Sequence, residues 1–260
     1  MMQLTFGFGA VEAEFWRWMF IMTRVGAALL AAPFFGASSV PMQVRVIVTG
    51  AIGILVCNWL PVQAPAQLLS LAGMLAVAGE VLIGLSLGMV LQIAFAAPVI
   101  AAELVGAGMG MSIATAADPN TGAHSPALGQ YYSVVLTLVF LALGGHLLFI
   151  DLVLKSYETF PPGQTWLGPD RIAMVGGYAA TMLLTALAIA LPVTLILLLV
   201  QLAAGMLSRS APSLNLFALG LPAGVLAGIG ALILSAQLLP DAMAALTADA
   251  LAHAEKVIAR

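Results

Sequence analysis

The sequence predicts an all-α membrane protein with about six long hydrophobic helices, and two observations lead to that prediction. Hydrophobic residues make up 62% of the 260 residues, and charged residues only 7%. A soluble domain carries about 25% charged residues. The 8 basic and 11 acidic side chains are therefore too few to keep a chain of this length in solution. The uncharged stretches are also long enough to cross a bilayer, which takes about 20 apolar residues.

Six stretches meet this length requirement. The third and the fifth are longer than one crossing needs, so each is tilted, extends beyond the bilayer or is broken. Pro192 lies inside the fifth stretch and is expected to kink it. After the last stretch, residues 241–260 space their apolar side chains as an amphipathic helix, and we expect residues 1–260 to form a single membrane-embedded domain. The six stretches cover approximately residues 15–35, 42–60, 68–97, 127–150, 172–207 and 214–239.

Several classes of protein are excluded by composition and motifs. The net charge of -3, without a cluster of Lys and Arg, argues against a nucleic-acid partner. Cys57 is the only cysteine, so the chain forms no intramolecular disulfide and no cysteine-based metal site. The sequence contains no metalloprotease, Walker or dinucleotide-binding motif. We therefore expect a chain that is not an enzyme and that binds no cofactor.

The segment between the third and fourth stretches, residues 101–130, does not fit a simple helical bundle. Gly106, Gly108 and Gly110 occupy every second position and discourage a stable helix. Non-helical backbone at membrane depth is tolerated only where protein buries it or where it lines a cavity. The segment is therefore predicted to form a re-entrant or pore-lining loop, with Met109 and Met111 as deformable apolar plugs. The alternative is an ordinary loop outside the membrane.

Charged residues inside the apolar stretches are costly and carry information. Arg24 lies in the first stretch and Glu80 in the third. They could form an ion or proton pathway, or they could pair between helices, and we expect the pairing, with a role in assembly. Two GxxxG motifs also predict close helix packing, against a helix of this chain or of another subunit. The residues predicted to act in subunit packing are Arg24, Glu80, Gly84, Gly88, Arg209, Pro212, Gly220 and Gly224.

Several motifs, which follow one another along the chain in the order usual for the family, resemble the FliR family of flagellar biosynthetic proteins. They are the run from Glu103 to Pro119, Gly144-Gly145-His146, FPPG at Phe160 to Gly163, the long Pro-to-Gly segment from Ala190 to Gly228, and APFFGASSVPMQVR at Ala32 to Arg45. The chain departs from the family pattern at Gly108, where glutamine is usual, and at Ile113, where phenylalanine is usual. Both departures lie in the segment that would form the gate.

The resemblance implies a subunit of a type III export gate, present in one copy and built from tilted helical hairpins. It implies assembly with FliP-type and FliQ-type subunits into a closed channel for unfolded flagellar proteins, beside FlhB-type and FlhA-type components. It also implies that the chain contacts lipid and is located in the bacterial inner membrane, at the flagellar basal body. The residues it assigns to the pore plug or gate are Gly106, Gly108, Met109, Gly110, Met111, Ser112 and Ile113.

Two alternatives remain open at this point. One is an ion-coupled membrane transporter that uses Glu80, Glu103 and Asp118 as relay sites. The lack of an internal duplication in the sequence argues against it. The other is the homologous export-gate subunit of a virulence secretion system (injectisome), which the Gly-Gly-His and Asn-Leu-Phe elements make less favoured than the flagellar branch.

Overall fold

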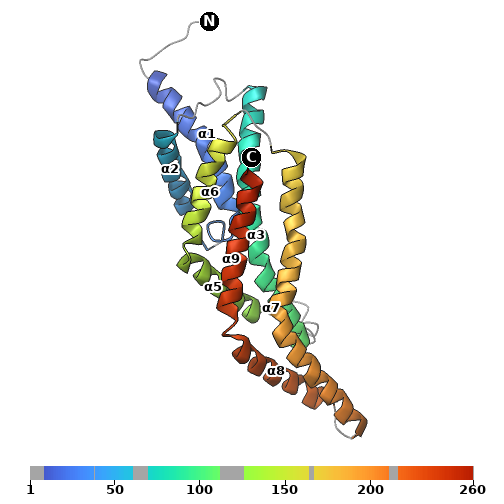
Figure 1. The fold of residues 1–260 in the computed structure, drawn as a ribbon. Helices are drawn as coiled ribbons and strands as arrows, with labels where there is room; N and C mark the ends of the chain where they lie inside the picture. Colours follow the sequence, from blue (N-terminus) through green and yellow to red (C-terminus); the bar gives the residue numbers. More distant parts are fainter. Residues whose placement is uncertain are drawn as a thin grey trace. The chain divides into compact units, whose positions relative to one another are not determined.

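A computed structural model describes residues 9–37, 39–60, 70–111, 126–163, 167–210 and 216–259 (Figure 1). The described residues form helices, joined by turns and bends, without a strand. Contacts between Cα atoms divide the chain into two compact units. The first unit contains Met1–Gln92, Gly145–Tyr178 and Ala250–Arg260, and the second contains Ile93–Gly144 and Ala179–Asp249.

The first unit is built around α1 (Gly9–Ala31), α2 (Met42–Trp59) and the beginning of α3 (Leu71–Gly108). Helix α6 (Gly145–Thr159), the start of α7 (Pro169–Ser210) and the end of α9 (Leu239–Ile258) complete it. Helices α1 and α2 lie side by side, and the Trp18 indole nitrogen donates a hydrogen bond to the Gly50 carbonyl at 3.0 Å. The apolar interior of this unit includes Phe20, Ile21, Val25, Ile83, Leu87 and Phe149.

The second unit contains the end of α3, α5 (Pro126–Ala142), most of α7, α8 (Leu216–Ser235) and the beginning of α9. Phe95 of α3 and Phe140 of α5 stack edge to face, with ring centroids 5.6 Å apart. Along α7, successive turns bury Ala186, Ala190, Val193 and Leu197. The other face of α7 is apolar and exposed, because Leu184 and Leu199 keep 69% and 60% of their surface uncovered by this chain.

The helix lengths support a membrane-embedded chain. Within the described residues, α2, α3 and Pro169–Leu207 of α7 are each long and apolar enough to cross a membrane. Two bent pairs, α5 with α6 and α8 with α9, raise the number to five if each pair is one span. Helix α1 does not meet this criterion, because Glu12, Glu14, Arg17 and Arg24 interrupt its apolar sequence. The predicted all-α membrane fold is confirmed, with three to five candidate spans against six hydrophobic stretches in the sequence.

Two stretches have different limits from those the sequence predicts. The fourth, expected to be one segment, is divided between α5 and α6 at Leu143 and Gly144, where Gly144 takes a positive φ of 69°. The third continues as helix beyond residue 97, passes through Pro98 and ends at Gly108. Helix α9 covers residues 241–258 of the predicted amphipathic tail, and it meets α8 at a bend of 67°.

Candidate functional site

A buried ion pair joins α1 to α3 inside the first unit. The Nε of Arg24 lies 2.7 Å from Oε2 of Glu80, and Nη2 of Arg24 lies 3.0 Å from Oε1. Two parallel bonds between a guanidinium and a carboxylate form the strongest and most directional kind of ion pair. Arg24 is 0% exposed and Glu80 is 1% exposed, so both charges are withdrawn from solvent and from lipid.

Backbone groups satisfy the rest of this cluster. Nη1 of Arg24 donates to the carbonyl of Ser156 at 2.8 Å, and Nη2 donates to the carbonyl of Phe160 at 2.8 Å. Oε1 of Glu80 accepts a hydrogen bond from the backbone N–H of Gly163 at 3.1 Å. The ring of Tyr157 lies 4.1 Å from the Arg24 guanidinium. The pair therefore connects α1, α3, the end of α6 and the turn that follows it. All three guanidinium nitrogens of Arg24 and both carboxylate oxygens of Glu80 make hydrogen bonds.

The glycines of α3 explain how the two helices come close enough for this pair. A β-carbon added to Gly84 would lie 2.2 Å from the carbonyl oxygen of Arg24. One added to Gly88 would lie 2.6 Å from the carbonyl oxygen of Ala28. The GxxxG motif therefore packs α3 against α1 within this chain. Arg24, Glu80, Gly84 and Gly88 were predicted to act in subunit packing, with the partner helix left open for the glycines, and the structure gives all four residues partners inside this chain.

A separate candidate site lies within the second unit, at the end of α3. Gly106 and Gly108 were predicted to discourage a helix, but both lie within α3. Backbone hydrogen bonds continue just past the helix, from the N–H of Met109 to the carbonyl of Val105 and from Gly110 to Ala107. Gly110 then takes a φ of 79°, a conformation that suits glycine and redirects the chain. Of the remaining predicted gate residues, Met111 is described, while Ser112 and Ile113 lie outside the described residues.

Met109 occupies a seat formed by the glycines of α8. Its side chain is 5% exposed. A β-carbon on Gly228 would lie 2.5 Å from Cγ of Met109 and 2.8 Å from its sulfur. A β-carbon on Gly224 would lie 3.2 Å from the Met109 carbonyl oxygen. Because any side chain at position 228 would take the space that Met109 fills, glycine there is what allows the methionine to pack against α8.

Helix α7 also contacts the end of α3. The side-chain nitrogen of Gln201 donates a hydrogen bond to the carbonyl of Gly108 at 2.8 Å. A β-carbon on Gly108 would lie 3.0 Å from Cδ1 of Leu197, so the glycine also allows close packing here. The helix end, which would otherwise expose an unpaired carbonyl, is thus capped by a polar side chain. We call Met109 with Gly224, Gly228 and Gln201 the α3 seat.

The other predicted packing residues have different surroundings. Gly224 faces Met109 of this chain, as part of the α3 seat. A β-carbon on Gly220 would meet no described atom within 4 Å. Arg209 is exposed in the last turn of α7, and Pro212 lies outside the described residues. Among the described members of the predicted set, Arg209 and Gly220 are therefore accessible to a partner.

Two contributors were missed by the sequence reasoning, whereas Gly228 was noted as the continuation of the four-residue glycine spacing of Gly220 and Gly224. Gln201 is a polar residue in a long apolar helix, which was a usable signal. The carbonyl of Phe160, which binds Arg24, gives no signal in the sequence because every residue has a carbonyl.

The structure and motifs can be compared with known proteins. The family described as bacterial export proteins, family 1, matches residues 15–250. The chain belongs to this family. The flagellar biosynthetic protein FliR of Pectobacterium carotovorum subsp. carotovorum is 32% identical over 223 residues, which cover 86% of this chain and 84% of the relative. The resemblance to FliR proteins that the motifs indicate is confirmed.

Two further relatives extend this comparison. FliR of Escherichia coli (strain K12) is 34% identical over 219 residues, covering 84% of this chain and 82% of the relative. FliR of Bacillus subtilis (strain 168) is 30% identical over 207 residues, covering 78% of this chain and 80% of the relative. In each case the match covers most of this chain and most of the relative. Membership of the family therefore concerns the chain as a whole and places it among the membrane-embedded proteins of flagellar export.

Proposed function

We propose that the chain is the FliR-type subunit of a flagellar type III export gate. In this role it assembles with FliP-type and FliQ-type subunits into a channel that unfolded flagellar proteins use to leave the cytoplasm, in the bacterial inner membrane at the flagellar basal body. FlhB-type and FlhA-type components would associate with that channel. Family membership and the apolar helices support the proposal, and the α3 seat supports a gate in particular.

The α3 seat is the observation that carries the gating role. A gate must hold the pore closed against ions and still deform when a polypeptide passes. Methionine suits both needs, since its unbranched side chain fills irregular apolar space and adapts easily. Met109 packs against the bare glycines Gly224 and Gly228 of α8. Gly106, Gly108, Met109, Gly110 and Met111 would then form the base of the gate, followed along the chain by Ser112 and Ile113.

Exposed apolar surface on α7 supports assembly with other subunits. Leucines on one face of α7 remain largely uncovered by this chain, and lipid or the apolar helices of neighbouring subunits would cover them. Arg209, exposed in the last turn of the same helix, would then contribute a charge to a subunit contact. We expect Arg209→Ala to lower the yield of complex, whereas Lys155→Ala, which alters an exposed surface charge, leaves the yield unchanged.

Co-purification tests the proposed function. The full chain would be tagged and expressed alone and together with its FliP and FliQ homologues, and the detergent-extracted mass determined by native mass spectrometry. A defined hetero-oligomer with one copy of this chain is the expected result. A stable monomer or homodimer that ignores those partners would contradict the proposal.

The two alternatives are weaker. An ion-coupled transporter needs Glu80 as a relay, but both of its carboxylate oxygens already accept hydrogen bonds from Arg24. Of the other two carboxylates proposed as relay sites, Glu103 is exposed and Asp118 lies outside the described residues. A virulence export gate shares the proposed chemistry, but the relatives from Pectobacterium carotovorum, Escherichia coli and Bacillus subtilis are named as flagellar proteins.

A further inference from the structure

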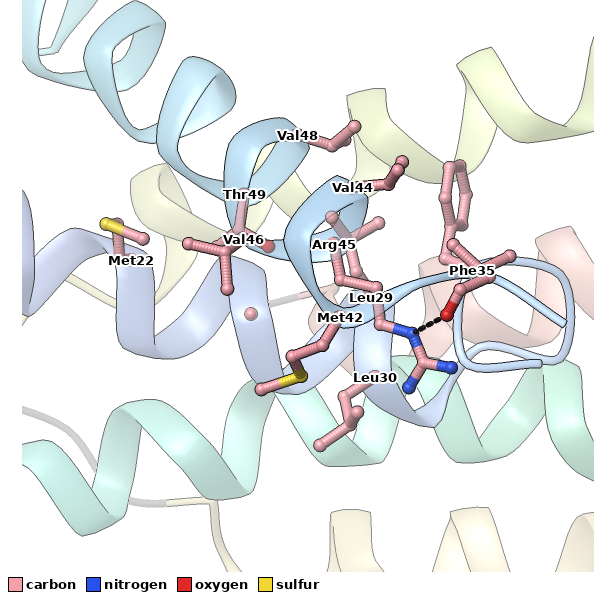
Figure 2. A pocket seen from close by; sticks show the side chains of 12 residues that line it. Met22, Leu29, Leu30, Phe35, Met42, Val44, Arg45, Val46, Val48 and Thr49 are labelled. Carbon is pink, nitrogen blue, oxygen red and sulfur yellow. Dashed lines mark hydrogen bonds between the residues drawn. The ribbon is translucent and has the colours of Figure 1, made fainter. Parts of the chain in front are cut away.

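A narrow apolar groove lies between α1 and α2 in the first unit (Figure 2). Its volume is about 250 Å³, and eleven of its twelve lining residues are uncharged. Met22, Leu29 and Leu30 of α1 form one wall, and Val44, Val46 and Val48 of α2 belong to the other. Pockets for drug-sized ligands occupy about 300–1,000 Å³, so this groove has room for one slender apolar chain.

Arg45 supplies the groove's single ionisable side chain. Figure 2 shows the guanidinium at one end of the groove, near Phe35 and Leu30, with Met22 toward the other end. Its Nε donates to the carbonyl of Val40 at 3.1 Å, and Nη2 donates to the carbonyl of Ala37. These two bonds orient the group, and a guanidinium has five N–H donors in all. None of the ion pairs in the described part of the chain includes Arg45.

The position of Arg45 along α2 adds to the argument. It lies in the first turn of a helix that is long and apolar enough to span a membrane. The end of such a span coincides with the level of the lipid headgroups. Helix α2 also begins after Pro41 without a side-chain cap, so the positive end of its dipole lies beside the same cation. The groove therefore combines an apolar slot with a positive end at headgroup depth.

We propose that this groove binds one anionic phospholipid. An acyl chain would lie between α1 and α2, and the phosphate would accept hydrogen bonds from Arg45 and face the start of α2. A wholly apolar helix from a partner subunit would leave the charge at the end of the groove without a counterpart, and a free phosphate would leave the slot empty. The proposal concerns a site other than the α3 seat and does not depend on the gating role.

Native mass spectrometry of the purified full chain tests the site, with phosphatidylglycerol and phosphatidylcholine of identical acyl chains as probes. The wild-type chain should retain one phosphatidylglycerol in preference to phosphatidylcholine. Arg45→Gln should weaken phosphatidylglycerol binding at least about fivefold, the effect of one basic residue near an anionic surface. Lys155→Gln, which removes an exposed charge outside the groove, should change nothing.

A second pair of variants tests the slot itself. Val46 lines the groove and is 50% exposed, so Val46→Trp should narrow the slot without burying a misfit in the core, and should reduce the binding of both lipids. Ile47→Trp places the same ring on the next residue, which does not line the groove, and should leave binding unchanged. Thermal unfolding of each variant shows that it is folded.

Three results would overturn the proposal. They are equal retention of the two lipids by the wild-type chain, retention of phosphatidylglycerol by Val46→Trp, and displacement of the lipid by inorganic phosphate alone. A photo-reactive residue at position 46 gives an independent reading in the complete complex. Cross-linking to a phospholipid supports the proposal, and cross-linking to a protein chain instead overturns it.

Discussion

The carbonyl oxygen of Arg24 on α1 occupies the space that a β-carbon on Gly84 of α3 would need, at a separation of 2.2 Å. Gly84 lies one helical turn beyond Glu80, whose carboxylate binds the side chain of the same arginine. The close approach of the two helices and their buried ion pair are therefore one arrangement. Glycine brings the backbones together, and the ion pair fixes their register.

Gly84→Ala should disturb this arrangement. The obstructing atom belongs to the backbone of α1, so the helices must move apart, and overpacking of this kind costs about 1–3 kcal/mol of the free energy of unfolding. Thermal or denaturant unfolding of the purified chain measures the loss. Gly176→Ala is the matched control, because a β-carbon there would meet no described atom within 4 Å. Equal effects of the two substitutions would show that helix propensity alone, and not the close approach, decides the result.

Glu80→Gln should destabilise the chain further, by about 3–5 kcal/mol, because it leaves the buried Arg24 charge uncompensated. Exchanging both residues for methionine should recover only part of the loss. The carbonyls of Ser156 and Phe160 would still lack the donors that Arg24 now provides. Lys155→Ala breaks an exposed ion pair with Asp151 and should have little effect. The idea of a buried structural pair fails if Glu80→Gln is as stable as the wild-type chain.

Gly228→Leu should expel Met109 from the α3 seat. The added side chain would occupy the space that now holds Cγ and the sulfur of Met109. We expect the assembled channel to conduct ions at rest, since the base of the gate would be displaced. Gly230→Leu adds the same side chain two residues along α8, where a β-carbon meets no described atom within 4 Å, and should leave the channel closed. A closed channel in both variants would count against the α3 seat.

Gln201→Ala should loosen the end of α3 without unfolding the chain. The lost hydrogen bond to the Gly108 carbonyl is worth about 1 kcal/mol. Hydrogen exchange should therefore become faster at the last turn of α3, and unchanged in the first turns of the same helix. Gln237→Ala, an exposed glutamine in the turn after α8, provides the control. The capping role is wrong if both variants exchange at the same rate.

Parts of this structure could be predicted from the sequence, for physical reasons. A charged residue in an apolar stretch is costly unless it is paired, and this cost favoured a pairing of Arg24 with Glu80 over an ion pathway. The low content of charge led to a helical membrane fold in the same way. The backbone carbonyls that complete the cluster could not be predicted, because no side chain marks them.

The end of α3 shows where the sequence argument failed. Each glycine costs a helix interior about 1 kcal/mol relative to alanine, and that cost predicted a loop at Gly106 and Gly108. In the structure, Gly108 lies against Leu197 and its carbonyl is bound by Gln201, and these tertiary contacts offset the cost. Local propensity does not include partners from a distant helix, so the length of α3 was underestimated. A β-carbon on Gly144 would meet no described atom within 4 Å, and the helix breaks there, with Gly144 at a φ of 69°.

Ion conductance of the assembled complex in a planar bilayer tests the central claim, that residues at the end of α3 close an export channel. The wild-type complex should show no ion conductance at rest. Deletion of residues 106–114 should open a steady ion leak, with the composition of the complex unchanged by native mass spectrometry. If the deletion complex has normal composition and conducts no more ions than the wild type, the claim that these residues close the channel is wrong.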